Sequence, residues 1–287
     1  MDPLAVRSML ERCVTSRCVR KWGRGMGLLA FVSDIHANIE ALVVVVDDIE
    51  AKGIAPEDVI CLGDVIGYGP NPAECLDIAL HFRATILGNH EEAVVNGAFG
   101  FSPMARQAIN WTRAQFKPRH FGSAQRKQRW DWLAELPYAY RDEEHGLYFV
   151  HGSPRDPTME YVQKSDCEGF FGEVPPKLRE IFGMIECPCL IGHTHVPCVI
   201  HEDATYESSA DLDNQITLEP NTKYVINVGS VGQPRDQDTR ACYCTYDTET
   251  RVLRWHRLEY DVEKTAAKIR ELPMLDNRSA DRLTMGM

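Results

Sequence analysis

The chain has 287 residues, which is long enough for one large domain or two small ones with a sizeable core. Its formal net charge of -11 opposes nonspecific binding to nucleic acids and to anionic membranes. No apolar run reaches the ~20 residues that a membrane-spanning helix needs. Composition therefore excludes a membrane-spanning protein and disfavours a basic nucleic-acid-binding one.

Residues 1–25 differ in character from the rest of the chain, because they are basic and precede the first clear strand pattern. They lack the apolar core of a secretory signal peptide. We interpret them as a flexible extension, or as an upstream start that leaves Met26 as the working first residue. The absence of a segment rich in Pro, Gly or Ser in the remainder favours a single domain over 26–287.

Ten cysteines are scattered along the chain, and none of them forms a CxxC pair. Several occur in apolar runs, where a thiol behaves as a small hydrophobic group. This pattern predicts reduced, structural cysteines and hence a cytoplasmic protein.

The first half of the chain alternates apolar runs with amphipathic stretches. The predicted elements are a strand at 28–33, a helix at 39–53, strands at 58–63 and 84–88, and helices at 104–116 and 124–136. The region 94–135 is expected to form a helical insert over one edge of the fold.

The second half of the chain reads as one strand after another, closed by a helix. The strands are predicted at 147–152, 187–195, 196–203, 223–230, 241–247 and 252–260, and the helix at 261–272. The first half of the chain thus has a strand–helix–strand order, and the second half has consecutive strands. This order predicts an α/β protein in which two sheets pack face to face with helices outside.

Five predicted strands are followed at once by side chains that bind metals. These are Asp34 with His36, Asp64, Asn89 with His90, His151, and His193 with His195. Loops at the carboxyl ends of strands converge on one crevice, and the glycines beside most of these residues permit close approach. Imidazole and carboxylate together suit Mn, Fe, Zn, Co or Ni better than Mg or Ca. The sequence therefore predicts a transition-metal site at the carboxyl ends of the strands.

The order of these motifs resembles that of the calcineurin-like metallophosphoesterases. The segments "GDVIGYGPNP", "GNHE", "VHGSPRDP", "GHTHVP" and "NVGSVGQPRD" look like the bacterial branch often labelled phosphodiesterase or diadenosine-tetraphosphatase-related. The resemblance covers 28–260. It implies a four-layer αββα sandwich with two mixed β-sheets and an active site at the carboxyl ends of the strands.

The resemblance also implies a role for each motif residue. Two divalent transition-metal ions are expected, Mn²⁺ or Fe first and Zn, Co or Ni as alternatives, with a metal-bridging hydroxide attacking phosphorus in line. One metal would be held by Asp34, His36 and His195, the other by Asn89, His151 and His193, with Asp64 bridging them. His90 would lie just outside the metals as the catalytic residue, either stabilising the transition state or protonating the leaving alkoxide.

The neutral ligand Asn89 is explained by charge. Two divalent ions bring a charge of about +4, and this ligand set supplies only the carboxylates of Asp34 and Asp64. A carboxylate at position 89 would bind metal more tightly but would make the cluster a poorer electrophile. An asparagine there keeps the centre electron-poor.

The sequence departs from the Ser/Thr protein phosphatases of the superfamily, which follow the GD motif with V-D-R-G. Here Gly67 replaces the Asp that orients the catalytic His, and Tyr68 replaces a phosphate-binding Arg. We therefore expect Glu91, Glu92 or a backbone carbonyl to orient the ring of His90.

Three further residues are candidate substrate contacts. Arg235 and Arg240 suit bidentate binding of phosphate, although a structural role fits each arginine equally well, and Tyr68 is expected at the mouth of the site.

A phosphodiesterase is the favoured function. The alternatives are a phosphomonoesterase, including hydrolysis of dinucleoside polyphosphates or Ser/Thr phosphoproteins, and a non-catalytic metal-binding scaffold on the same fold. We expect a small phosphoester or nucleotide as substrate, with no membrane partner and nucleic acid disfavoured. The sequence leaves the oligomeric state open.

Overall fold

A computed structural model describes residues 27–119, 122–169 and 172–287. The basic extension expected at 1–25 lies outside the described residues. The strands form two mixed sheets of six strands each. The first sheet runs in the order β3 (Ala84–Thr85), β2 (Val59–Cys61), β1 (Leu28–Val32), β11 (Ala241–Asp247), β12 (Val252–Leu258) and β9 (Gln215–Thr217). The second runs in the order β4 (Ala139–Asp142), β5 (Leu147–Val150), β6 (Cys189–Ile191), β10 (Tyr224–Asn227), β7 (Cys198–His201) and β8 (Tyr206–Ser208).

Each sheet has a parallel part, and these parts carry the functional loops. β1, β2 and β3 are mutually parallel neighbours, as are β5, β6 and β10, whereas the remaining pairs are antiparallel. Strands that run parallel end at the same edge of a sheet, so the loops at their carboxyl ends lie together.

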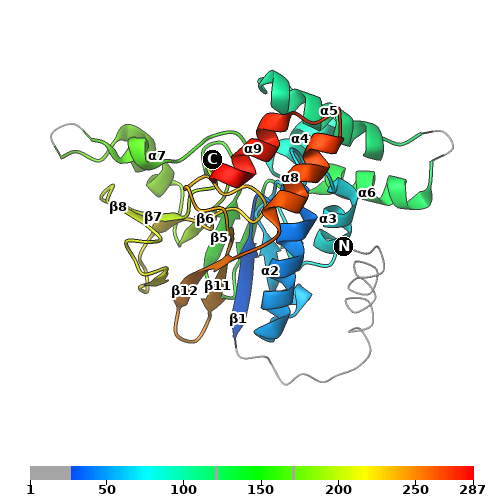
Figure 1. The fold of residues 1–287 in the computed structure, drawn as a ribbon. Helices are drawn as coiled ribbons and strands as arrows, with labels where there is room; N and C mark the ends of the chain where they lie inside the picture. The colour runs from blue at the N-terminus through cyan, green and yellow to red at the C-terminus, as the bar shows by residue number, and fades with distance from the viewer. Residues whose placement is uncertain (1–26, 120–121, 170–171) are drawn as a thin grey trace.

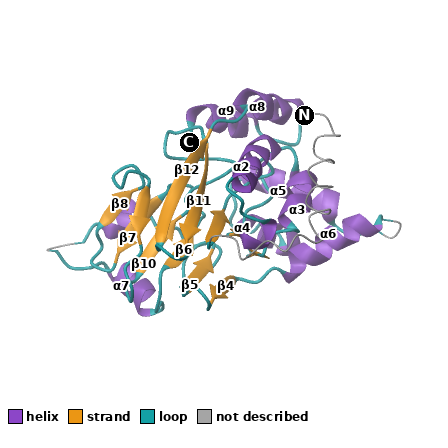
Figure 2. Ribbon diagram, turned by 90° about the horizontal axis from the view of Figure 1, so that it is seen from below, coloured by secondary structure: helices purple, strands orange, loops and turns teal. Residues whose placement is uncertain are grey.

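The two sheets pack face to face with helices on both outer faces, as Figures 1 and 2 show. Apolar side chains from both inner faces fill the space between the sheets, where the rings of Phe31 and Phe149 lie 5.2 Å apart. Helices α2 (Ile39–Ala51) and α3 (Pro72–Ala79) cover the first sheet, and α7 (Pro176–Gly183) covers the second. The predicted four-layer αββα sandwich is confirmed.

The remaining helices lie at the edges of the sandwich (Figure 1). They are α4 (Asn89–Asn96), α5 (Pro103–Phe116), α6 (Ala124–Glu135), α8 (Val262–Glu271), α9 (Asn277–Met285) and the 3₁₀ turns η1 (Pro56–Asp58) and η2 (Lys164–Cys167). Phe116, Trp130 and Trp132 pack against the core that α2 and α3 cover, so these three aromatic side chains serve packing.

The strand predicted at 84–88 is shorter in the structure and is succeeded by a helix that the sequence did not predict. β3 ends at Thr85, and α4 begins at Asn89. The helix starts here because the Glu91 carboxylate accepts a hydrogen bond (3.1 Å) from the N–H of Gly88 and so caps its first turn. Asn89 and His90 therefore lie in the first turn of a helix.

Two further properties of the described residues concern their cysteines and the character of their helices. All eight of their cysteines are unpaired, and six of these are buried. Within the described ranges, no helix combines the length and the apolar character that crossing a bilayer requires.

Candidate metal centre

Seven candidate metal ligands converge at one edge of the sandwich. They come from the loops after β1 (Asp34, His36), β2 (Asp64), β5 (His151) and β6 (His193, His195), and from the first residue of α4 (Asn89). All seven side chains are buried. The structure thus brings together every residue that the sequence proposed as a metal ligand.

One group of potential ligand atoms surrounds Asp34. Its Oδ1 lies 3.1 Å from His195 Nε2, and that nitrogen lies 3.1 Å from His36 Nε2. Asp64 Oδ2 lies 3.7 Å from His36 Nε2 and so borders the same space.

A second group lies on the other side of Asp64 Oδ2. That oxygen is 3.5 Å from His151 Nε2 and 2.9 Å from Asn89 Oδ1, and the latter two atoms are 3.1 Å apart. The Nδ1 atom of His193 lies 3.3 Å from Asn89 Oδ1. Asp64 Oδ2 is therefore common to both groups, as a bridging ligand must be.

Four backbone carbonyls fix the orientation of the four histidines. His36, His151 and His195 each place Nδ1 on a carbonyl oxygen, at 3.3, 2.8 and 2.5 Å respectively, while His193 uses Nε2 at 3.2 Å. The accepting carbonyls belong to Ile66, Leu62, Gln233 and Met159. A ring nitrogen that donates to a carbonyl leaves the other nitrogen with a free lone pair.

The atoms that face the cluster are consequently almost all acceptors. The free lone pairs of the histidines point at one another and at carboxylate oxygens, and Asp34 Oδ1 is buried without a hydrogen-bond donor. Such an arrangement is repulsive unless cations occupy the space between the atoms. The residues present thus fit a metal centre of nitrogen and oxygen ligands.

The electrostatics of the cluster also call for positive charge. Although burial opposes protonation of the His151 ring, the Asp64 carboxylate raises the pKa of His151 to about 9. A proton on that ring is a local means of compensating the carboxylate when no cation is bound. A bound metal ion would replace the proton.

The backbone around the cluster is held in an unusual conformation. Asp34, His36, Asp64, His193 and His195 all have positive φ, between 48° and 65°. Residues other than glycine seldom adopt this region, and when they do so together they mark a functional site. In D-x-H and H-x-H segments this conformation lets both side chains leave the strand toward the same space.

His90 lies beside this cluster in an aromatic enclosure. Its ring is 4.9 Å from that of His36, 4.5 Å from that of Tyr68 and 5.4 Å from that of Phe101. Burial lowers the pKa of His90 to about 4, so the ring is neutral at pH 7. A neutral ring favours hydrogen-bond stabilisation of the substrate over complete proton transfer.

The expectation that Glu91, Glu92 or a carbonyl orients His90 is wrong. His90 Nδ1 is buried and has no hydrogen-bond partner among the described residues. It lies directly against Gly67, where an added Cβ would come within 2.0 Å of that nitrogen. The ring is therefore positioned by packing, and its proton is expected on Nε2, because Nδ1 has no acceptor within reach.

Glu91 has a different role, since its buried carboxylate binds the loop that carries Asp64. Oε2 accepts from the N–H groups of Asp64 (2.8 Å) and Gly88 (3.1 Å), and Oε1 accepts from that of Ile66 (3.0 Å). The carboxylate thus fixes the bridging ligand relative to the start of α4. From the sequence, Glu91 was expected as a candidate partner of His90, and no local pattern indicates its contact with the Asp64 loop.

We expect Glu91→Gln to destabilise the protein by about 1–3 kcal/mol, because its NH₂ group would face one of these buried N–H donors. The measurement is the free energy of unfolding in urea, together with metal content. Glu92→Gln is the matched control, since Glu92 accepts from the hydroxyl of Thr158 (2.6 Å) and an amide oxygen can do the same. Equal stabilities of the two variants would contradict this role.

A cavity of about 310 Å³ opens over the cluster. Beyond the cluster residues, its wall includes Tyr68, Phe101, Tyr161, Arg235 and Arg282. The ring of Tyr161 stacks on that of His193, with centroids 3.9 Å apart. Two of the three residues proposed as substrate contacts, Tyr68 and Arg235, therefore reach this cavity.

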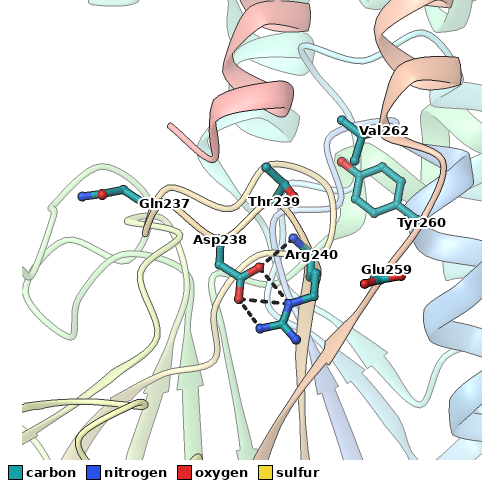
Figure 3. A pocket seen from close by; sticks show the side chains of 7 residues that line it. All are labelled: Gln237, Asp238, Thr239, Arg240, Glu259, Tyr260 and Val262. Carbon is teal, nitrogen blue, oxygen red and sulfur yellow. Dashed lines mark hydrogen bonds and ion pairs between the residues drawn. The ribbon is translucent and has the colours of Figure 1, made fainter.

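Arg240 is not brought to the cluster. It lines a separate hollow with residues such as Glu259 and Tyr260, and its guanidinium is paired with Asp238 through Nε and Nη2 (Figure 3). The side chain is thus neutralised locally. Conversely, the sequence did not predict Tyr161, Phe101 and Arg282, which carry no local motif.

Comparison with known proteins places this geometry in a family. A family model described as calcineurin-like phosphoesterase matches residues 28–227. An uncharacterized protein of Methanocaldococcus jannaschii is 32% identical over 248 residues, which cover 84% of this chain and 91% of that protein.

Solved structures agree with that assignment. A metallophosphoesterase from Sphaerobacter thermophilus is 31% identical with a TM-score of 0.72, covering 91% of this chain and 99% of that one. A hypothetical protein from Pyrococcus horikoshii OT3 shares the fold at 17% identity and a TM-score of 0.66, covering 91% and 98% of the two chains.

Proposed function

The chain belongs to the calcineurin-like phosphoesterases and is a metal-dependent phosphoric ester hydrolase, and from this premise we propose that it is a phosphodiesterase with a two-metal centre. The observation that carries the proposal is the position of Asp64 Oδ2, which borders both groups of ligand atoms. Asp34, His36 and His195 would hold one ion, and Asn89, His151 and His193 the other, with Asp64 between them.

Divalent ions in such a centre supply Lewis acidity and an ionised water as nucleophile. The protein's own residues contribute positioning. The carbonyl-bound histidines keep their lone pairs directed inward, and His90 presents Nε2 to the cavity as a hydrogen-bond donor for the oxygen on which charge develops. The nitrogen and oxygen ligands, without a thiolate, support Mn²⁺ or Fe as the native ions, with Zn, Co or Ni as alternatives.

A cytoplasmic location also stays a prediction.

The wall beside His90 supports a diester over a monoester. Tyr68 occupies the position where protein phosphatases carry an arginine, and Phe101 packs on the other side of His90. These aromatic rings suit an ester substituent better than an additional charged oxygen.

The test is to compare hydrolysis of bis-p-nitrophenyl phosphate and p-nitrophenyl phosphate by Mn²⁺-loaded protein. We expect the diester to be hydrolysed with the higher kcat/KM, and EDTA to abolish turnover. Hydrolysis of the monoester alone would favour the phosphomonoesterase alternative. Fully loaded protein that hydrolyses no phosphoester would favour the scaffold.

We expect Asn89→Asp to retain both metals and to lose about tenfold or more in kcat. A tenfold loss corresponds to an activation barrier that is higher by about 1.4 kcal/mol. The new carboxylate would replace an amide oxygen that lies 2.9 Å from Asp64 Oδ2 and would reduce the net positive charge of the centre. Metal content by elemental analysis and kcat on the same sample check the result. Unchanged turnover would contradict the charge argument.

A further inference from the structure

Two arginines line the cavity over the metal ligands without a carboxylate partner. The guanidinium of Arg282 forms no hydrogen bond or ion pair with any residue in the described ranges, and it belongs to helix α9 near the end of the chain. Arg235 donates from Nη2 to Gln233 Oε1 (2.8 Å), but its buried Nε has no partner among those residues. The only carboxylate in the described wall of the cavity is that of Asp64, which belongs to the metal cluster.

A backbone hydrogen bond joins the segment that carries Arg235 to the helix that carries Arg282. The N–H of Gln237 donates to the carbonyl oxygen of Gly286 (2.9 Å), which joins the segment after Arg235 to the residue that caps α9. On its other face, α9 packs through Ala280 and Leu283 against α8 and α5. Figure 1 shows α9 lying beside α8 over the top of the sandwich. These contacts hold α9 in place, so Arg282 stays at the cavity wall although no carboxylate in the described ranges pairs with it.

Both arginines line the same cavity wall as Tyr68, which contacts His36 and His90. The ring centroid of Tyr68 lies 4.9 Å from that of His36 and 4.5 Å from that of His90. The positive charge of the arginines is therefore close to the place where the scissile phosphate would bind.

Charge then limits the substrate. Two divalent ions against two carboxylates already leave a surplus that one phosphate ester group, of charge -1 or -2, largely compensates. Two unpaired arginines add a further charge of +2 to the same cavity. Arginine binds phosphate oxygens through two parallel N–H groups. Two arginines that have no carboxylate partner in the cavity are therefore suited to bind an additional phosphate.

We propose that Arg235 and Arg282 form a second anion subsite, which binds a further phosphate group of the phosphodiester substrate. This inference rests on the proposed function for the position of the first phosphate. Arg235 and Tyr161 also line an adjoining hollow of about 410 Å³, whose wall includes Val196 and Tyr206. That hollow provides room for the remainder of a substrate larger than a simple phosphate ester.

The experiment measures inhibition of bis-p-nitrophenyl phosphate hydrolysis by inorganic phosphate and by pyrophosphate in Mn²⁺-loaded protein. We expect Arg282→Gln to raise the inhibition constant of pyrophosphate about tenfold and that of phosphate no more than about twofold, because a charge-assisted contact is lost only by the second phosphate. Chelation of metal by pyrophosphate is the same for every variant, so it cancels when variants are compared.

Arg278→Gln is the matched control. Arg278 lies on the same helix, is exposed and pairs with Asp276 (2.7 Å), so its loss should leave both inhibition constants as in the wild type. An equal increase of both constants in Arg282→Gln would overturn the proposal, because Arg282 would then bind the scissile phosphate. No change in either constant would overturn it as well.

The failure of the proposed function has a different signature. Wild-type protein that hydrolyses neither nitrophenyl ester would contradict the hydrolase but not the subsite. The subsite is then measured by the increase in Tm that a fixed pyrophosphate concentration gives. A smaller increase for Arg282→Gln than for Arg278→Gln supports the subsite, and equal increases overturn it.

Discussion

Replacing His90 by alanine should lower kcat about 10²–10³-fold while both metal ions stay bound, because the variant loses a positioned donor to developing charge. His90 is neutral at pH 7, and its buried Nδ1 has no partner in the described ranges, so the proton is expected on Nε2, directed to the cavity. That donor would act on an oxygen of the scissile phosphate or on the leaving oxygen. The loss should therefore be larger for an alkyl ester than for a p-nitrophenyl ester, whose leaving group needs less stabilisation.

Metal analysis separates this role from direct ligation. His90 lies within reach of His36 and Asp64, so a third grouping of potential ligand atoms includes it. If His90→Ala loses a metal ion in proportion to its activity, His90 is a metal ligand and not a hydrogen-bond donor to the substrate. His201→Ala is the control, because this histidine is the last residue of β7 and is paired with Glu207 of β8, away from the cluster.

Replacing Gly67 should inactivate the protein nearly as fully as replacing His90 itself. Gly67 has φ +92°, and an added Cβ would lie 2.0 Å from His90 Nδ1 and within 3 Å of two other ring atoms. The ring is enclosed by Tyr68 and Phe101, so it can move only by leaving its position toward the cavity. We expect Gly67→Ala and Gly67→Asp to lose kcat about 10²-fold or more through the misplaced donor.

Gly53→Ala is the matched control for the backbone cost. Gly53 also has positive φ (+77°), but an added Cβ there would meet no atom within 4 Å. Alanine at Gly53 should cost only about 1 kcal/mol of stability from the left-handed conformation and leave kcat intact. The measurements are urea unfolding and kcat on the same preparations. If Gly67→Asp keeps the kcat of the wild type, an aspartate can be accommodated beside the His90 ring. That result would contradict the claim that packing against Gly67 positions His90.

The candidate metal ligands were predictable because each lies directly after a local pattern. Asp34 with His36 and His193 with His195 end apolar runs that read as buried strands, and glycine accompanies most of the five motifs. Parallel strands bring their carboxyl ends together, so this rule alone predicts that the five motifs lie close to one another. The same patterns predicted the two sheets and the outer helix 39–53, which the structure has as α2.

Helices whose start depends on a cap or on a distant partner were not predicted. α4 begins where the Glu91 carboxylate binds three backbone N–H groups, two of them from the distant loop around Asp64. α7 and α9 are short, and their apolar faces become clear only once the surface that they cover is known. Local pattern cannot reveal a contact of this kind.

The sequence by itself determined the family, the sandwich of two sheets and the set of candidate metal ligands, because these depend on residue type and on the order of strands along the chain. Only the tertiary structure decided which side chains complete the site. It separated Arg235, which reaches the cavity, from Arg240, which Asp238 neutralises, and it brought Arg282 in from the end of the chain. It also showed that His90 is held by packing against Gly67 and not by a hydrogen bond. Such choices depend on distances between segments far apart in sequence, which no local pattern of residues encodes.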